Sequence, residues 1–439
     1  MYVFSNRLKI ASFVLMALGI IGLASGFLTV PKTVDEAKAI VASQQGGHGE
    51  SHGEAILDEL GVPKSVQNTE EAHGAEHDLH VLHQLQSRPW SATMVAAFFF
   101  MMIALGALVF YAIQYASQAG WSPVLYRVIE GVTAYLLPGS IIVLLIVVFA
   151  GTHFYPWQDK ELVAGDQILQ DKAVYLNFPF FVIRALILVV GWNLYRYFSR
   201  RNALLQADAV GYKPYKENFK ISVIFLLFFL VTEAPMAWDW FMSMTPHWYS
   251  TMFAWYIFAS MFVTGITVVA LVTIYLKGKG LLPMVNDRHL HDLGLYMFAF
   301  SIFWTYIWFG QFMLIWYANI PEEVTYFVMR IQEYNGLFFG MLVLNFVFPI
   351  LVLMNSDYKR IPWFVVTTGI MILIGHYIDV FQLVMPSTVG PYWQFGIPEI
   401  AAICFFSGLF VFVVGTALAK VPLRVKGDPF IKESENYHY

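Results

Sequence analysis

The chain has few charged residues and almost no cysteine. Of its 439 residues only 13% are charged, whereas soluble domains carry about 25%. The lone cysteine, Cys404, lies inside an apolar stretch. One cysteine excludes a disulfide framework, a zinc finger, a cysteine-ligated iron–sulfur cluster and a CxxCH haem attachment. The formal net charge of −4 gives no sign of a nucleic-acid partner.

Apolar residues take the place of charge. The chain is 58% hydrophobic and 17% aromatic, with a mean hydropathy of +0.60. This composition is typical of a polytopic membrane protein. A helix needs about 20 apolar residues to cross a bilayer, and the sequence predicts an all-α integral membrane protein with ten transmembrane helices, at residues 10–30, 91–115, 124–150, 178–198, 219–242, 251–276, 292–318, 330–354, 362–385 and 397–419.

The spans divide the chain into five predicted segments. These are an N-terminal helix (1–30), a His-rich extracytoplasmic loop (31–90), two groups of four helices (91–242 and 251–385), and a last helix with its tail (397–439). The first apolar run is too long for a signal peptide. Eighteen of the 26 lysines and arginines fall on the side of the two termini. The positive-inside rule therefore predicts that both termini are cytoplasmic.

The loop at 31–90 contains six histidines: His48, His52, His73, His77, His80 and His83. His73, His77 and His80 could share one face of a helix, a spacing that suits a metal ion. Glutamates accompany the histidines along the loop. We favour a solvated loop that contacts an extracytoplasmic partner, because His-rich tracts are weak evidence for a metal site.

Ionisable residues inside the predicted spans are the candidate functional groups. Each costs at least about 2.5–3.5 kcal/mol to insert in a membrane, so each needs a partner or a function. All but Glu130 are predicted in the outer parts of their helices. The set comprises Glu130, Arg184, Glu233, Asp239, Glu333, His376, Asp379 and Glu399.

His376 and Asp379 are the most informative pair. At i and i+3 they project from one face of a helix and can contact each other. A histidine beside a carboxylate can exchange protons near neutral pH. The other interpretation is a structural ion-pair network that includes Arg184.

Two acidic residues in the fifth span are further candidates. Glu233 stands two residues before Pro235, whose ring frees a backbone carbonyl and can open a cavity that holds water. The structural alternative pairs Glu233 with Arg184 in a proline-kinked packing helix. Asp239 is predicted nearer the membrane interface and is the weaker candidate.

Ser260, Thr264 and Thr267 form a hydroxyl stripe along the sixth span. Such a stripe can support a water chain, but more often it serves close helix packing, which Gly265 favours. A two-haem b-type cytochrome needs four histidine ligands. Only His376 and His153 qualify, so we expect no haem in this chain.

Three stretches resemble a known family: WFGQFMLIWYANIPEEVTYF (308–327), GHYIDVFQLVMPS (375–387) and EGVTAYLLPGSIIVLLIVV (130–148). They are similar to the second large membrane subunit of alternative complex III, a bacterial quinol:electron-acceptor oxidoreductase. The resemblance covers residues from about 90 to 425. The family belongs with the NrfD-like membrane anchors of polysulfide-reductase type.

The resemblance implies two NrfD-like four-helix bundles, helices 2–5 and 6–9, flanked by helices 1 and 10, in a bacterial inner membrane. It implies a sister ten-helix subunit, an extracytoplasmic iron–sulfur subunit, c-type haem subunits and membrane lipids as partners, with no cofactor bound by this chain alone. The sister subunit carries a GHAGT-type motif beside its quinol pocket. This sequence has no such motif, which argues against a quinone site in this chain.

Carried over by position, the family's proton-conducting residues fall on Glu130, Glu233, Asp239, His376 and Asp379. The expected function is that of an integral subunit of a quinol-oxidising respiratory complex. In that complex the chain acts as a scaffold and translocates protons without catalysing a reaction alone. The alternatives are a secondary proton-coupled transporter and a purely structural membrane anchor.

Overall fold

The computed structural model describes residues 1–45 and 64–438, with side chains for 1–43 and 77–438. This part of the chain is all-helical and contains no strand. Ten helical segments in it are long and apolar enough to cross a membrane. The prediction of an all-helical chain with ten candidate spans is confirmed, and the fold is that of a multi-pass membrane protein.

The spans follow the predicted order and mostly begin and end within a few residues of the predicted limits. The third and eighth spans are interrupted, by a 3₁₀ turn and a π-helical turn respectively. The segments are α1 (Asn6–Leu28), α4 (Lys64–Ala116), η1–α5–η2–α6 (Pro123–Phe149), α9 (Phe178–Leu205), α10 (Lys213–Trp240), α11 (Phe253–Gly278), α12 (Asp287–Ala318), α14–η6–α15 (Asn335–Leu353), α16 (Pro362–Thr388) and α17 (Ile397–Ala419).

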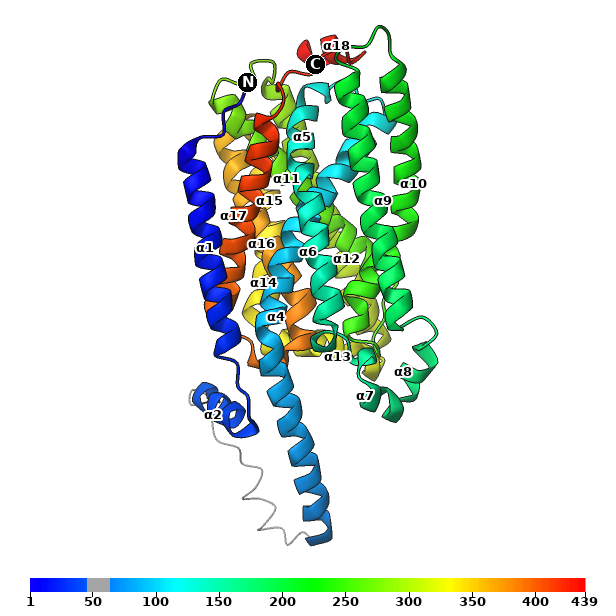
Figure 1. Cartoon of the computed structure of the whole chain (residues 1–439), viewed down its shortest axis with the longest axis vertical. Coiled ribbons are helices and arrows are strands. Elements are labelled where there is room, and N and C mark those ends of the chain that lie inside the picture. Colours follow the sequence, from blue (N-terminus) through cyan, green and yellow to red (C-terminus); the bar gives the residue numbers. More distant parts are fainter. Residues whose placement is uncertain (46–63, 439) are drawn as a thin grey trace.

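Short helices lie outside the spans at both ends of the molecule. They are α2 (Val34–Gln45), α7 (Lys160–Gly165), α8 (Gln167–Lys172), α13 (Pro321–Glu333) and α18 (Ile431–Glu435). Helices α2, α7, α8 and α13 lie at one end of the molecule (Figure 1). Helix α18 and both termini lie at the other end, as an even number of spans requires. We call the first the α13 end and the second the terminal end.

The part of the predicted loop at 31–90 that the structure describes is largely helical. Helix α2 occupies part of it, and α4 starts at Lys64 and continues through Pro89 into the membrane span. The first part of α4 extends beyond the other helices at the α13 end (Figure 1). Pro89 removes one backbone donor but does not end the helix, because the residues around it pack against neighbours. His48 and His52 lie outside the described residues.

The most buried spans are α4 and α11, with 89% and 78% of their apolar stretches inside the molecule. Helix α4 contacts α6, α10, α11, α16 and α17, and α9 contacts α6 and α10. Helix α11 contacts α12 and α16, while α16 also packs on α14 and α15. Helix α1 lies along α17 at the periphery. The contact of α4 with α11 therefore joins the first half of the chain to the second.

Two glycines allow this central contact. A β-carbon at Gly265 would lie 2.5 Å from the backbone nitrogen of Ala107, and one at Gly106 would lie 2.1 Å from the carbonyl oxygen of Met261. No side chain fits between the backbones at that separation. Thr264 and Thr267 bond their own helix carbonyls. These contacts agree with the packing interpretation of the hydroxyl stripe at these two residues.

The C-terminal strap (residues 420–438) is held against the terminal end by side-chain hydrogen bonds. Ser434 donates to the carbonyl of Trp121 at 2.6 Å, and Gln206 donates to the carbonyl of Gly427 at 2.9 Å. Asp428 is buried in the strap, and burial raises its pKa to about 6.

Gly265→Val should destabilise the protein because the added side chain must push α4 away from α11. Overpacking of this kind costs about 1–3 kcal/mol or more. We expect a lower thermal unfolding midpoint in detergent. Gly278→Val is the matched control, since a β-carbon there meets open space. Equal midpoints for the two variants would contradict the role of the central contact.

Docking of the strap should weaken as pH rises through about 6. Asp428 has a raised pKa when docked, so its neutral form is favoured there and the docked state loses stability once the carboxyl ionises. Hydrogen exchange of residues 420–438 should therefore be slower at about pH 5 than at about pH 8 after correction for intrinsic rates. Asp428→Asn should remove this difference. An unchanged difference in the variant would contradict it.

Candidate functional site

His376 and Asp379 lie on one face of α16, as their spacing predicts. Both side chains are fully buried, and His376 Nδ1 is 3.1 Å from Asp379 Oδ2. Proline at position 362 starts the helix, where its missing N–H costs nothing. The two residues sit four and five turns along the helix, between α11 and α12. The predicted contact between them is confirmed.

The Asp379 carboxylate is satisfied by three further donors. The hydroxyl of Tyr256 donates to Oδ1, and Ser260 Oγ and Trp304 Nε1 donate to Oδ2 at 2.8 and 3.0 Å. Tyr256 and Ser260 come from α11 and Trp304 comes from α12. These hydrogen bonds offset the cost of burying the carboxylate, since a buried charge without partners is strongly unfavourable.

The hydrogen-bond pattern assigns the proton on His376. Nδ1 faces Asp379 Oδ2 and also Ser260 Oγ, at 2.9 Å. Because Ser260 gives its proton to the carboxylate and the carboxylate only accepts, Nδ1 carries the ring proton. Nε2 is then the acceptor nitrogen, and it is buried without a hydrogen-bond partner among the described residues. The imidazole can accept a proton at Nε2 while Nδ1–H already faces Asp379.

Arg330 lies between this pair and an open cleft. It belongs to α13, is 3% exposed, and its guanidinium stacks 3.4 Å from the centre of the Tyr326 ring. It donates to the carbonyls of Gln382 (2.9 Å) and Tyr326 (2.7 Å), and forms no ion pair with any described residue. Arg330 is thus a buried cation held by carbonyl oxygens and a ring.

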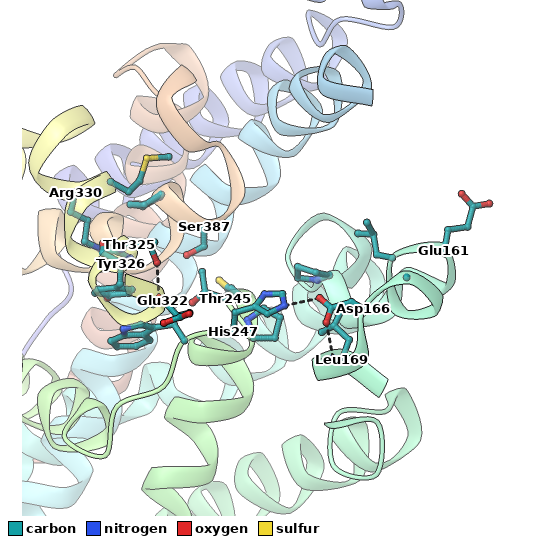
Figure 2. Close-up of a pocket in the computed structure, with 18 residues that line it drawn as sticks. Glu161, Asp166, Leu169, Thr245, His247, Glu322, Thr325, Tyr326, Arg330 and Ser387 are labelled. Atoms are coloured by element: carbon teal, nitrogen blue, oxygen red, sulfur yellow. Dashed lines mark hydrogen bonds and ion pairs between the residues drawn. The ribbon is translucent and has the colours of Figure 1, made fainter. Parts of the chain in front are cut away.

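The cleft opens at the α13 end and has a volume of about 650 Å³ (Figure 2). Arg330 and Tyr326 line it on one side, and His247, paired with Asp166 at 2.6 Å, lines it on the other. Glu322 adds a further carboxylate. The cleft is therefore polar and charged where it approaches Arg330.

A small cavity lies between Arg330 and Tyr256. Its volume of about 10 Å³ suits about one water molecule. Both polar atoms of the Gln382 side chain are buried without a protein partner, and Gln382 lines this cavity. A water there would bond the Gln382 amide and lie next to Tyr256, which donates to Asp379. The polar groups thus run from the cleft to Asp379 with one gap of water size.

On the other side of His376, Gly375 brings the backbone of α16 against Asn345. A β-carbon at Gly375 would lie 2.1 Å from Asn345 Oδ1. Asn345 sits in the π-helical turn η6 (Val343–Val347), and such turns occur frequently at functional sites. The Asn345 amide and the Thr368 hydroxyl are buried without partners among the described residues. These groups extend the polar region toward the terminal end.

Asp239 and Arg184 form a separate structural pair. Arg184 Nε and Nη2 donate to the two carboxylate oxygens at 2.6 and 2.9 Å, the bidentate geometry of strong pairs. The guanidinium also stacks on the rings of Tyr175 and Phe180. Arg184 therefore pairs with Asp239, so its predicted structural pairings with Glu233 and with the His376–Asp379 network are wrong.

Glu233 and Glu130 lie apart from His376. Glu233 Oε1 is buried without a partner, on α10 of the first half of the chain. Glu130, on α5, pairs with Arg127 at 2.8 Å and accepts from Tyr111 at 3.0 Å. No hydrogen bond among the described side chains joins either carboxylate to the α16 pair. The five residues predicted to transfer protons thus lie at four separate sites, and only His376 and Asp379 share one.

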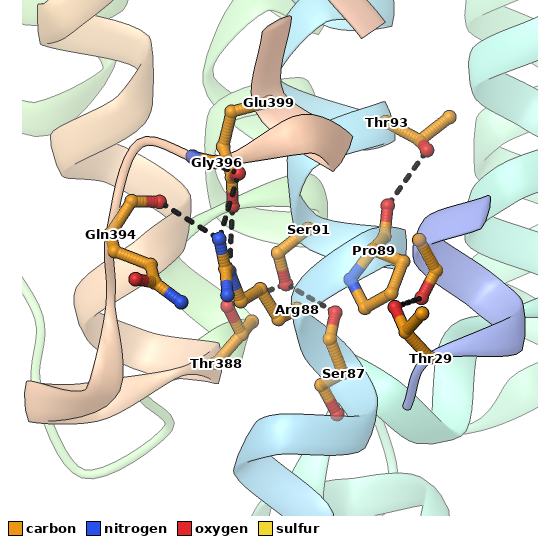
Figure 3. A network of polar contacts seen from close by, with 11 residues as sticks. Thr29, Ser87, Arg88, Pro89, Ser91, Thr93, Thr388, Gln394, Gly396 and Glu399 are labelled. Carbon is orange, nitrogen blue, oxygen red and sulfur yellow. Dashed lines mark hydrogen bonds and ion pairs between the residues drawn. The ribbon is translucent and has the colours of Figure 1, made fainter. Parts of the chain in front are cut away.

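Glu399 is the predicted cap of the last span, and the structure confirms it. Its carboxylate accepts the backbone N–H of Gly396 at 2.8 Å and is held by Arg88 at 2.8 and 3.0 Å (Figure 3). Glu333 is exposed at the end of α13, a surface helix. The predicted span 330–354 wrongly included the last residues of this helix. It accepts from Trp393 through its backbone carbonyl alone.

The histidines do not assemble into a metal centre in the described residues. No group of three or more His, Cys, Asp or Glu there could hold an ion. His77 and His80 are exposed on α4, His80 next to Gln84, and the side chain of His73 lies outside the described residues. His77, His80, His83 and His153 line a cleft of about 600 Å³.

The residues that complete the site were not predicted from the sequence. Tyr256, Trp304 and Arg330 carried no motif, and Ser260 was interpreted as packing although it bonds both His376 and Asp379. One signal was available for Arg330: the segment PEEVTYFVMRIQE repeats apolar residues every three to four positions, which predicts an amphipathic helix. A lone arginine on its buried face calls for an explanation.

Breaking the Arg184–Asp239 pair should destabilise the chain rather than change its chemistry. Asp239→Asn leaves the largely buried Arg184 without its counter-charge, at a cost of about 3 kcal/mol. Arg184→Met in the same chain should recover most of this loss. The measurement is a double-mutant cycle of unfolding midpoints in detergent, and strictly additive effects would contradict the pairing.

Comparison with known proteins places the chain in no family. No model of a known protein family matches it, and no curated protein matches its sequence. The conclusion that the geometry supports is a multi-pass membrane protein with a buried histidine–carboxylate pair between an open cleft and a line of unpartnered polar groups.

Proposed function

We propose that this chain is an integral membrane subunit of a quinol-oxidising respiratory complex of the alternative complex III type. In this proposal it is a scaffold that also moves protons and has no redox centre of its own. The three resembling stretches support the proposal, because one of them (375–387) contains His376 and Asp379 and another (308–327) reaches Tyr326 beside Arg330.

The helix packing supports an NrfD-like arrangement. Helices α4, α6, α9 and α10 contact one another in a ring, and α11, α12, α14–α15 and α16 do the same. The pair of α1 and α17 flanks them. This agrees with two four-helix bundles, helices 2–5 and 6–9, with helices 1 and 10 outside.

The buried His376–Asp379 pair carries the proton-transfer part of the proposal. Protons reach Nε2 of His376 from the side of Asn345, and Nδ1–H passes one to Asp379. From Asp379 the path continues through Tyr256 and the water-sized cavity to the cleft beside Arg330. Arg330 holds a positive charge next to this exit. The role of Glu233 as a separate proton-transfer site in the first bundle stays a prediction.

The proposed orientation places the terminal end in the cytoplasm and the α13 end outside a bacterial cell. It follows from the distribution of lysine and arginine. The outer surface formed by α2, α7, α8 and α13 then faces the iron–sulfur and c-type haem subunits, and electrons pass through these partners. The sister ten-helix subunit lies alongside in the membrane.

A proton-coupled transporter is the second candidate. The interruptions at η2 and η6 favour it, because transporters bind substrate at broken helices. Purification in mild detergent separates the two functions. Co-purification with subunits that carry haem and iron–sulfur absorbance supports the respiratory subunit, whereas a lone chain supports the transporter.

Asp379→Asn should leave the assembled complex intact and lower quinol turnover at least about tenfold, because the amide keeps the shape of the carboxyl group but cannot bind and release a proton. Turnover and proton release in proteoliposomes are the measurements. Glu333→Gln is the control, since this carboxylate is exposed and outside the network. Normal turnover and proton release in a fully assembled Asp379→Asn complex would contradict the relay and leave a scaffold.

A further inference from the structure

The terminal end of the first bundle holds more positive than negative charge. Arg127, Arg196 and Arg200 surround Glu130 where α5 and η2 (Thr133–Tyr135) meet α9. Arg127 forms an ion pair with the Glu130 carboxylate. Arg200 reaches only the backbone oxygen of Glu130, at 3.5 Å, and Arg196 reaches only the hydroxyl of Thr133, at 3.4 Å. Neither forms an ion pair with any described residue, so two positive charges are left uncompensated.

These two arginines lie in the last three turns of α9, near the level where a bilayer around the spans would meet water. Arg200 is five residues and Arg196 nine residues before the end of α9, about 7.5 and 13.5 Å along the helix axis. Long arginine side chains extend toward the interface from such depths. Tyr197 and Phe198, between them in sequence, are 61% and 43% exposed. Aromatic residues of this kind are typical of the headgroup region.

The two guanidinium groups are close enough to repel each other and have donors to spare. At i and i+4 they share one face of α9, where like charges are unfavourable, more so in an apolar surrounding. Arg196 uses only Nε and Arg200 uses only Nη1 among the described contacts. A phosphate supplies the missing negative charge and matches the planar donor fork of arginine.

The surface beside the arginines is aliphatic. Leu137 and Ile141 of α6 and Leu194 of α9 are 47%, 43% and 50% exposed. Such an aliphatic surface suits acyl chains. The position at a helix end, the excess charge and the aliphatic flank together favour a lipid over the carboxylate of another subunit.

We propose that Arg196 and Arg200 bind the headgroup phosphate of an anionic phospholipid, whose acyl chains lie along α6 and α9. Basic sites between helices at this level are the places where membrane proteins hold such lipids. The site is independent of the proposed respiratory role, since it concerns the lipid-facing side of the first bundle.

The test is native mass spectrometry of the full-length chain, in whatever assembly it is purified, together with thermal unfolding in detergent during titration with phosphatidylglycerol. The wild type should retain phosphatidylglycerol, and its unfolding midpoint should rise more with that lipid than with phosphatidylcholine. Arg196→Gln with Arg200→Gln should lower retention at least about fivefold per arginine. Arg201→Gln, an exposed arginine on the same helix, is the matched control.

Three results would overturn the proposal. The first is equal stabilisation of the wild type by phosphatidylglycerol and phosphatidylcholine, which needs no variant. The second is equal stabilisation by inorganic phosphate alone, which would identify a free anion as the ligand. The third is lipid retention only after removal of a partner subunit, which would assign the site to a protein carboxylate. If the double variant fails to fold, Arg200→Gln alone should show the partial loss.

Discussion

A charge removed from water must find a counter-charge or hydrogen-bond donors, and this constraint explains the interior of the protein. The structure meets it in different ways. Asp239 and Glu399 are held bidentately by Arg184 and Arg88, which fixes helices to one another. Asp379 instead accepts from neutral donors and from His376. A histidine beside a carboxylate can exchange a proton with it, which is why this second arrangement carries the proposed proton transfer.

The separation of the buried charges follows from the helix packing. Tight backbone contact at Gly106 and Gly265 joins the two halves, while the hydrogen-bond partners of the His376–Asp379 pair come from α11 and α12. Arg330 of the surface helix α13 lines both the cleft at the α13 end and the small cavity beside Tyr256, so one side chain and a cavity of water size lie between the cleft and the buried site. The first half of the chain has its own buried charges, around Glu130 on α5 and around Asp239 on α10.

Much of the fold could be predicted from the sequence, because ten apolar runs of sufficient length have only one stable state in a bilayer. The contact of His376 with Asp379 was also predictable, since helical spacing alone brings i and i+3 together. The partner of Arg184 was not, because Glu233 and Asp239 both lie on α10 and only the packing angle selects between them. Tyr256, Trp304 and Arg330 come from other helices, and no local pattern reports such tertiary neighbours. The helical extension of α4 was not predicted because the residues before the span are polar and carry no apolar run.

The most direct test of the proposed relay is infrared difference spectroscopy of the purified complex between its quinol-reduced and oxidised states. A relay through the pair predicts a protonated-carboxyl band that changes on turnover, shifts in deuterium oxide, and is lost in Asp379→Asn while the assembled complex persists. A difference spectrum identical in the wild type and the variant would contradict proton transfer through Asp379.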